Sequence, residues 1–433
     1  MTNAPTIGRH SLNPLQAERP VGHDNLGSTA RRIVIGLLLG ALVVAFAGAL
    51  ALAALHETAG TNSYALLADA WLHGRLYVDR CFDLDCANFE GRSYIIFPPV
   101  PAVIALPFVA LFGPGFHAFL PLTILAFAAT GVIWWRIAAA VTQSRDSTTL
   151  LVLIVLFATP LYFVTLRGDH VWFFAQSWGF LFSSAALYCA LVRRNALLAG
   201  LFVALAFLCR QMTILYLPLV YLLLLRDEPL FRIDGVAVRR ALSLAAFPLI
   251  AIAIYLVYNY ARFGSPMETG YAYIFKDPAL ANSAGAFIGN RVRELGIFSR
   301  DYLPFNLVYM FFAGPHVVFA GPYMTQFAGF DASGASLFLV TPALLIGFLA
   351  RWDRSFWLGL GTCAVILGVT LFYHSNGFSQ YSAQRYALDW LPILLVFVAR
   401  GMKPGFAGAL SIFTFYAMAV TLGMIVVGRV AAG

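Results

Sequence analysis

Charged side chains are scarce in this chain. Of its 433 residues only 11% are charged and 61% are hydrophobic, whereas about a quarter of the residues of a soluble domain are charged. Apolar segments recur from Arg31 to the C-terminus, each close to the ~20 residues that a helix needs to cross a bilayer. They do not alternate between apolar and polar residues, which excludes a β-barrel. The sequence therefore predicts an all-α polytopic membrane protein.

The hydropathy pattern predicts about 11 to 13 transmembrane helices. The expected spans cover residues 31–55, 94–112, 118–138, 149–166, 172–192, 196–209, 212–225, 241–261, 335–350, 356–373, 386–399 and 405–428. Four of them fall between Arg92 and Arg193, which would return the chain to the outside, although Arg193 and Arg194 are typical of a cytoplasmic loop. Either one of the four is re-entrant or these arginines depart from the rule, and the side of the C-terminus stays open.

Arginines also set the expected orientation. Residues 1–30 are polar and rich in Pro, Gly and Asn, which indicates a disordered tail, and the late, long apolar run that follows is not typical of a cleavable signal peptide. Arginines before the first span predict a cytoplasmic N-terminus. The large loop 56–92 and the long segment 262–334 are then outside, within the membrane domain 31–433. No soluble basic domain is present, so nucleic acid is excluded as a partner.

The first outer loop is expected to contain a short helix. Asn62 or Ser63 is a suitable N-cap and Gly74 a suitable C-terminal stop. One apolar stripe has helical spacing and consists of Tyr64, Leu67, Ala68 and Trp71. We expect this amphipathic helix to lie in the membrane interface with its Tyr and Trp at headgroup level, and Asp69 to point at water or a cavity.

Several segments together resemble the GT-C glycosyltransferases, specifically the bacterial relatives of protein O-mannosyltransferases and aminoarabinose transferases. The first outer loop carries the matching positions Tyr64, Ala68, Ala70, Gly74, Leu76, Gly91, Arg92, Tyr94, Pro98 and Pro99. The segments "GLFVALAFLCRQ" (200–211), "NYARFGSPMETGY" (259–271) and "QRYALDWLP" (384–392) resemble further parts of these proteins.

The resemblance implies an inverting transfer of a sugar from a polyprenyl-phosphate-linked donor to an acceptor hydroxyl of a glycan, lipid or protein. It places this reaction at the periplasmic face of the bacterial inner membrane, with one catalytic carboxylate in the first outer loop. The chain departs from the family twice. The usual Asp-Glu pair is replaced by Gly60-Thr61-Asn62, and the basic residue common before Pro-Pro is Phe97.

Sugar transfer needs a base within hydrogen-bond reach of the acceptor hydroxyl. The first outer loop offers Asp85, Asp69, Asp83 and Glu57 as candidates. Asp83 and Asp85 form an Asp-x-Asp element that could also hold a divalent ion, so a metal requirement is left open, and no other cofactor is indicated. No His/Cys spacing is typical of a zinc site.

The donor phosphate requires cations. Arg210 interrupts an apolar run without an evident partner, which indicates a functional role; Arg92, Arg262 and Arg385 are further candidates at loop edges. Candidate substrate contacts are Tyr64, His170, Glu268, Tyr271 and His374.

Two of the five cysteines, Cys81 and Cys86, lie in the first outer loop. Because the periplasm is oxidising and a turn can bring residues at this spacing together, we predict a disulfide that holds Asp83 and Asp85 at the mouth of the site. Cys189, Cys209 and Cys363 are expected to be small buried residues.

Two alternatives to a glycosyltransferase use the same kind of substrate. A transporter or flippase of lipid-linked substrates would need internal repeats and acids buried in the spans, and the sequence indicates neither. A ligase or polymerase of lipid-linked glycans would share the donor without requiring this first-loop layout.

Overall fold

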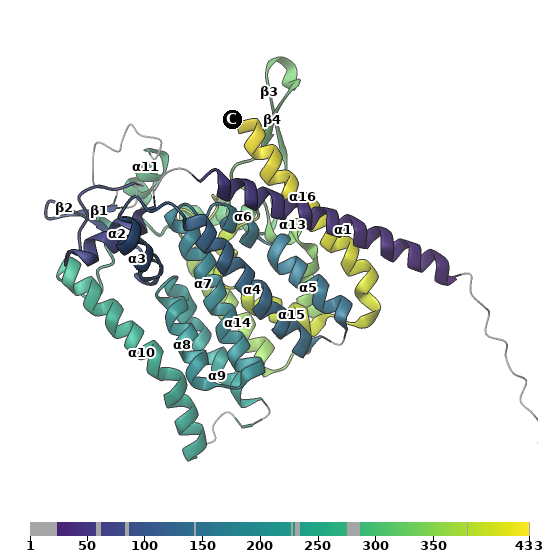
Figure 1. The fold of residues 1–433 in the computed structure, drawn as a ribbon, viewed down its shortest axis with the longest axis horizontal. Helices are drawn as coiled ribbons and strands as arrows, with labels where there is room; N and C mark the ends of the chain where they lie inside the picture. Colours follow the sequence, from purple (N-terminus) through teal and green to yellow (C-terminus); the bar gives the residue numbers. More distant parts are fainter. Residues whose placement is uncertain are drawn as a thin grey trace, which may run out of the picture.

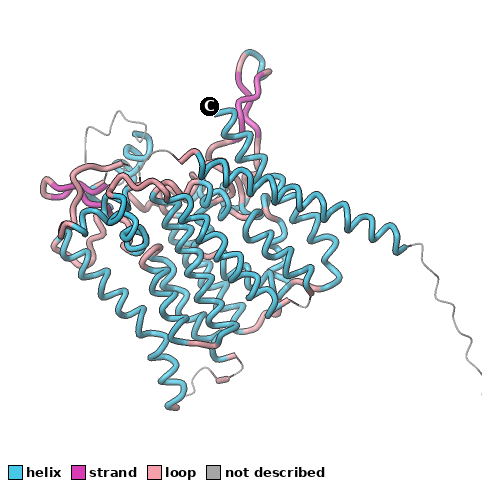
Figure 2. Tube along the Cα trace, viewed as in Figure 1, coloured by secondary structure: helices cyan, strands magenta, loops and turns pink. Residues whose placement is uncertain are grey.

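The computed structural model describes residues 24–57, 62–82, 86–142, 144–226, 228–229, 234–274, 286–378 and 380–432. Its helices are α1 (Asp24–Leu55), α2 (Ser63–Leu72), α3 (Val100–Phe112), α4 (Phe119–Val141), α5 (Arg145–Phe157), α6 (Pro160–Leu166), α7 (Val171–Tyr188), α8 (Ala196–Phe207), α9 (Leu217–Leu225), α10 (Gly235–Phe263), α11 (Ala286–Leu295), α12 (Leu303–Phe311), α13 (Leu337–Val340), α14 (Arg354–Leu371), α15 (Leu391–Gly401) and α16 (Ala407–Ala432). Four short strands form two separate antiparallel hairpins, β1 (Cys86–Phe89) with β2 (Arg92–Ile95) and β3 (Val317–Ala320) with β4 (Gln326–Phe330). The chain is a helical bundle with both hairpins at one end (Figures 1 and 2).

Full-length spans are fewer than the hydropathy pattern predicts. Among the described residues, six helices are long and apolar enough to cross a membrane, or seven if α5 and α6, which are bent by 48°, form one broken span. Four shorter apolar segments add to these: Val100–Phe112, Ala196–Phe207, Gln211–Leu225 and Leu391–Gly401. The predicted 11 to 13 spans are therefore approached only if these short helices are counted, because breaks at turns and 3-10 segments shorten them.

The segment 94–112 is not a full-length span. Strand β2 uses its first residues, and α3 has 13 residues, or about 20 Å at 1.5 Å per residue, which is less than the ~30 Å apolar thickness of a bilayer. Pro99 and Pro101 start α3, and the Val100 N–H donates to the carbonyl of Leu208 at 3.1 Å. The crossings between Arg92 and Arg193 are then α4, the bent α5–α6 pair and α7, which removes the conflict with a cytoplasmic Arg193.

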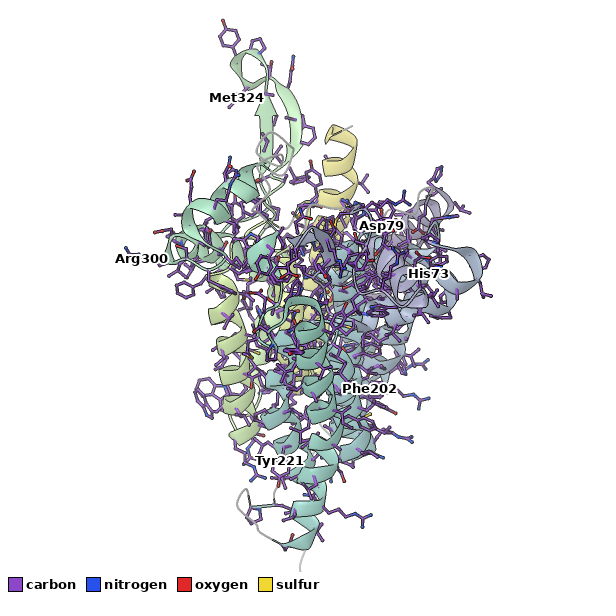
Figure 3. The ribbon with its side chains drawn as sticks, turned by 90° about the vertical axis from the view of Figure 1, so that its left-hand side faces the viewer. His73, Asp79, Phe202, Tyr221, Arg300 and Met324 are labelled. Atoms are coloured by element: carbon purple, nitrogen blue, oxygen red, sulfur yellow. A yellow bond between two sulfur atoms is a disulfide. The ribbon has the colours of Figure 1, made fainter. Side chains whose placement is uncertain are left out.

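Basic residues gather at the end of the bundle opposite the hairpins. Arg194 donates to the carbonyl of Leu223 at 2.6 Å, Arg240 pairs with Glu228 at 3.0 Å, and Arg400 donates to Ser355 Oγ at 2.6 Å. Figure 3 shows Tyr221 near this end, whereas His73, Asp79 and Arg300 lie toward the other. Both ends of the bundle therefore carry arginines, and they differ in loop content, with the two hairpins at one end only.

Helix α7 is central to the bundle. In its membrane-length window (Val171–Arg193) 72% of the residues are buried inside the protein, compared with 17% for α1 (Thr29–Leu55). Helix α15 packs nearby, and all but one of its residues, Arg400, are buried. A polar side chain on the inner face of α7 is therefore enclosed by protein and not by lipid.

One expected boundary changes. Helix α1 begins at Asp24, so the predicted tail 1–30 overlaps its first turns, and residues 1–23 lie outside the described part of the chain. The outer segment 262–334 contains α11, α12 and the β3–β4 hairpin.

Candidate active site

The first outer loop forms a buried helix. Asn62 caps α2 by accepting a hydrogen bond from Tyr64 N at 3.0 Å, and Gly74 follows the last turn with φ of +69°, which confirms both predicted ends. The expected interfacial position of Tyr64 is wrong. Its side chain is fully buried, with its ring 6.1 Å from those of Phe97 and Phe174, because the apolar stripe of α2 packs on protein.

The disulfide between Cys81 and Cys86 is confirmed, with Cα atoms 6.2 Å apart. Cys86 begins β1, opposite Ile95 of β2, so the bridge attaches the loop to a hairpin. Asp83 and Asp85 lie outside the described residues. Arg92 is exposed on β2, with its guanidinium 4.6 Å from the ring centre of Tyr77.

Glu57 lies against the start of α4. Its carboxylate accepts hydrogen bonds from the backbone N–H groups of Phe119 and Leu120 at 3.1 Å, the donors that a helix N-terminus leaves unpaired. Burial raises the pKa of Glu57 to about 7, and the negative charge of Asp169 acts in the same direction, against the lowering effect of the Leu120 and Phe119 hydrogen bonds. A carboxyl group with this pKa can accept a proton near neutral pH.

Asp169 belongs to the turn between α6 and α7. Its Oδ2 lies 2.8 Å from His170 Nδ1, and its backbone carbonyl accepts a hydrogen bond from the side chain of Asn62 at 3.1 Å. Burial acts to raise the pKa of Asp169, but the hydrogen bond and charge of His170, the charge of Arg167 and a backbone hydrogen bond together outweigh burial and lower it. This turn therefore joins the first outer loop to the start of α7.

Arg167 extends this cluster toward the C-terminal half of the chain. His170 lies beside the Asp169 carboxylate, and Arg167 lies 3.3 Å from the other ring nitrogen of His170. Arg167 also donates to Gln380 Oε1 at 3.2 Å. Segments more than 200 residues apart in sequence thus meet at this point.

A single aromatic ring links two arginines. The guanidinium of Arg167 lies 5.5 Å from the ring centre of Phe173, and that of Arg385 lies 5.1 Å from it. Arg385 is 8% exposed and donates to Gln176 Oε1 at 3.1 Å. Phe173 and Gln176 are three residues apart on α7, so they lie on the same side of the helix and hold Arg385 within the protein.

Arg210 forms an ion pair that the sequence reading did not find. It donates through Nε and Nη2 to both carboxylate oxygens of Asp389, at 2.9 and 2.6 Å. Asp389 is 4% exposed, and Tyr216 donates to its backbone carbonyl at 3.1 Å. The premise that Arg210 has no partner is therefore wrong, whereas its contact with a phosphate stays a prediction.

Arg210 continues the row of arginines along α7. Its guanidinium lies 5.7 Å from the ring centre of Tyr386, and that of Arg385 lies 4.7 Å from the same ring. A Cβ added at Gly179 would lie 2.8 Å from Arg210 Cγ. The absence of a side chain at this position of α7 therefore leaves room for the side chain of Arg210. Two aromatic rings, Phe173 and Tyr386, thus connect Arg167, Arg385 and Arg210.

Arg262 lies in a different setting. It is 3% exposed and donates to the carbonyl of Ile95 and to Asn259 Oδ1, both at 2.8 Å, with its guanidinium 3.9 Å from the ring centre of Tyr258. These contacts tie the end of α10 to the β1–β2 hairpin.

The remaining candidates are dispersed. Asp69 lies 3.6 Å from His73 on the outer part of α2, and Glu268 accepts a hydrogen bond from Gly270 N within its own turn at 2.7 Å. Tyr271 begins the short 3-10 turn Tyr271–Tyr273 that follows α10. Burial and the charge of Arg291 lower the pKa of His374 to about 4, so this ring is neutral at pH 7.

A metal site is not formed by the described part of the chain, where no three His, Cys, Asp or Glu side chains come close enough to share an ion.

Sequence analysis missed Asp389 and Gln176. Each is a polar residue inside an apolar segment, which is the signal that marked Arg210. Asp389 falls within the segment "QRYALDWLP". From this segment the sequence analysis selected only Arg385 as a candidate site residue.

Several solved structures are similar to this fold. ArnT from Cupriavidus metallidurans in the apo state has 14% identity and a TM-score of 0.43, over 85% of this chain and 61% of that chain. The same protein bound to undecaprenyl phosphate has 13% identity and a TM-score of 0.42, over 85% of this chain and 62% of that chain. The archaeal oligosaccharyltransferase AglB from Archaeoglobus fulgidus, in complex with an inhibitory peptide and a dolichol-phosphate, has 13% identity and a TM-score of 0.43, over 89% of this chain and 56% of that chain.

The chain spans 56% to 62% of the length of these neighbours. No protein-family model and no curated protein matches the chain. Because the identities and TM-scores are this low, the residues of the site itself have to carry a functional proposal.

Proposed function

We propose that this chain is a GT-C-type glycosyltransferase that moves a sugar from a polyprenyl-phosphate-linked donor to an acceptor hydroxyl. The observation that carries the proposal is the row Arg167, Arg385 and Arg210 along α7. Arg167 shares the turn before α7 with Asp169, whose charge acts on the partly buried carboxylate of Glu57. Arginine forks suit phosphate oxygens, and a carboxyl group with a pKa near 7 suits a general base. A lipid-borne phosphate and a proton acceptor are the two requirements of this reaction.

In the proposed reaction the acceptor oxygen attacks the anomeric carbon of the donor sugar. The bond from that carbon to the phosphate oxygen breaks, and the electron pair leaves with the polyprenyl phosphate. Glu57 takes the proton of the acceptor hydroxyl, and attack from the face opposite the phosphate inverts the anomeric centre. The arginines stabilise the negative charge that develops on the leaving phosphate.

The arginines have different parts in this proposal. Arg385 and Arg167 contact the phosphate in this proposal, because both guanidinium groups lie against the same ring, at 5.1 and 5.5 Å from the ring centre of Phe173. Arg210 is bound to both oxygens of Asp389, which fixes the segment that carries Arg385. By fixing this segment, Arg210 positions Arg385 for phosphate binding. Its positive charge also contributes to the electrostatic field at the site.

The choice of base rests on the geometry of Glu57. Asp69 is the rival within the described residues and lies with His73 on the outer part of α2. Asp83 and Asp85 remain candidates, either as the base or as ligands of a divalent ion, and chelation of divalent ions during turnover distinguishes these roles.

We place the site at the periplasmic face of a bacterial inner membrane. The basic cluster that includes Arg194, Arg240 and Arg400 lies at the opposite end of the bundle, and arginine-rich ends face the cytoplasm. The disulfide between Cys81 and Cys86 at the site end is typical of an oxidising compartment. The N-terminus would then be cytoplasmic.

A flippase of lipid-linked substrates is favoured by one observation. Asp389 is a buried acid among the helices, whereas the sequence reading placed the charges in loops. Its bidentate contact with Arg210 leaves it fully paired, which suits a fixed structural link better than a site that exchanges protons.

The test uses purified full-length protein in lipid nanodiscs with a polyprenyl-phosphate donor carrying a radiolabelled sugar and a bacterial envelope extract as acceptor. We expect label to appear in an acceptor product and polyprenyl phosphate to be released. Glu294→Gln, an exposed carboxylate on α11, is the matched control for Glu57→Gln. Donor that crosses the bilayer of a proteoliposome without any sugar transfer would contradict the proposal in favour of the flippase.

A further inference from the structure

The β3–β4 hairpin projects from the end of the bundle that carries the candidate site. Figure 1 shows it rising beside the C-terminal end of α16, and in Figure 3 its tip, marked by Met324, is the most distant part of that end. The strands pair antiparallel, with Val317 opposite Phe330. A turn at Pro322–Met324 closes the ribbon.

The hairpin is apolar on both of its faces. No charged side chain occurs between Val317 and Phe330. Its large exposed side chains are Val317 (40%), Val318 (39%), Phe319 (48%), Tyr323 (96%), Met324 (68%) and Phe327 (47%). Successive residues of a strand point to opposite faces, so the exposure of both Val317 and Val318 means that each face is partly open, although the end of β4 packs on α16.

A ribbon of this kind is not expected to stand in water. An isolated two-stranded hairpin is marginally stable at best in water, and exposed apolar patches of this kind mark interaction surfaces. We therefore expect the hairpin to contact a partner that offers apolar surface to its side chains and hydrogen-bonding groups to its open strand edges.

The base of the hairpin is continuous with the lipid-facing surface of α16. An apolar groove of about 400 Å³ joins them and is lined by Pro315, Phe330, Tyr416, Ala419, Val420 and Gly423. The apolar run of α16 reaches Gly428, which Arg429 follows in the sequence, five residues beyond Gly423, or about 8 Å at 1.5 Å per residue. The base of the ribbon is thus level with the outer part of the span.

Two features keep the ribbon out of the hydrocarbon core. Its strands have open edges, and unpaired backbone groups are not tolerated in hydrocarbon. His316 and Asp331 flank the ribbon at its base, where Nδ1 of His316 lies 3.8 Å from Oδ2 of Asp331. They are the charged or titratable residues immediately before β3 and after β4 in the sequence. The layer that accepts both aromatic side chains and hydrated backbone is the membrane interface, where Tyr and Trp are enriched.

We propose that the β3–β4 hairpin lies on the lipid bilayer, with Tyr323 and Met324 among the headgroups and the groove at its base occupied by a lipid acyl chain. The hairpin is then a second membrane contact of the chain, beside its spanning helices. It holds the loop end of the bundle at a fixed height over the lipid surface. This interaction surface does not depend on the proposed sugar transfer.

The test places an environment-sensitive fluorophore on the hairpin tip. Tyr323→Cys is labelled with NBD in the full-length protein and reconstituted into nanodiscs of phosphatidylethanolamine and phosphatidylglycerol, with and without acyl-chain-brominated lipid. The native free cysteines Cys189, Cys209 and Cys363 are buried, so labelling is selective. We expect blue-shifted emission that the brominated lipids quench.

Arg300→Cys is the control, since Arg300 is exposed at the same end of the bundle and should show neither the shift nor the quenching. Adding Met324→Asp and Phe319→Asp to the labelled Tyr323→Cys protein should reduce the quenching. Water-like emission at position 323 without quenching would overturn the proposal. Efficient cross-linking between two copies at position 323, with no quenching by lipid, would also overturn it and indicate a second copy of this chain as the partner.

Discussion

Arg210 and Asp389 form a bidentate ion pair across 179 residues of sequence, with donor–acceptor distances of 2.9 and 2.6 Å. The pair connects the turn between α8 and α9 to the segment before α15. Because Asp389 is 4% exposed, its carboxylate has almost no access to water that could replace the arginine. The arrangement of the candidate site depends on this pair.

Breaking the pair from one side should destabilise the protein. Asp389→Asn leaves the partly buried guanidinium of Arg210 without its counter-charge, and removal of one partner from a buried pair typically costs about 3–5 kcal/mol. We expect a clear fall in the melting temperature of the detergent-solubilised protein, followed by intrinsic fluorescence. The double variant Arg210→Met with Asp389→Leu should be more stable than Asp389→Asn. Equal melting temperatures for Asp389→Asn and the wild type would show that the pair does not hold this region.

Arg385 should govern binding of the lipid phosphate. Arg385→Ala removes a charge-assisted contact, and we expect polyprenyl-phosphate affinity to fall about 10- to 100-fold. Arg385→Lys should recover part of it, because the charge remains and the fork is lost. Binding is measured with the purified protein by microscale thermophoresis, and Arg300→Ala, an exposed arginine at the same end of the bundle, is the matched control. An unchanged affinity for Arg385→Ala would remove this residue from the phosphate site.

The disulfide should matter for the loop more than for the fold. Cys81 and Cys86 are five positions apart, and the stabilisation expected from a cross-link grows with the size of the closed loop. We predict that Cys81→Ser with Cys86→Ser changes the melting temperature little and lowers turnover. In the wild type, mass spectrometry without reductant should find neither thiol alkylated. A large loss of stability with unchanged turnover would assign the bridge a role in folding.

The raised pKa of Glu57 predicts a pH dependence. As a base Glu57 acts in its ionised form, so kcat/KM should rise with pH through about 7, the pKa that burial gives this carboxyl group. The stability linkage has the opposite sign. The folded protein holds a proton that the unfolded chain, with an ordinary Glu pKa of 4.5, has released, so this group makes folding less favourable as pH rises from about 4.5 to 7. A profile that is flat between pH 6 and 8 would point to another base.

Local rules identified much of the fold from the sequence. The ends of α2 follow from hydrogen-bonding residues next to one another, Asn62 as its cap and Gly74 as its stop, and most span positions follow from hydropathy. The bridge between Cys81 and Cys86 follows from short spacing and topology. These features depend on residues that are near in sequence, so no tertiary information is needed to find them.

Features that depend on tertiary packing could not be predicted. An apolar stripe does not distinguish protein from lipid as its partner, so Tyr64 was expected at the membrane surface and is instead buried. A hydropathy window does not detect where Pro99 and strand β2 shorten a span to the 13 residues of α3. Asp389 lies 179 residues from Arg210, and only the packed bundle brings them together.

The central claim is that Glu57 acts as the base in a transfer from a lipid-phosphate sugar. The measurement that tests it most directly compares single-turnover sugar transfer and donor binding for the wild type, Glu57→Gln and Glu294→Gln in nanodiscs. We predict that Glu57→Gln binds donor with near wild-type affinity and transfers sugar about 10²- to 10⁴-fold more slowly, while Glu294→Gln matches the wild type. Wild-type transfer rates in Glu57→Gln would contradict the claim, and would return the role to Asp69, Asp83 or Asp85.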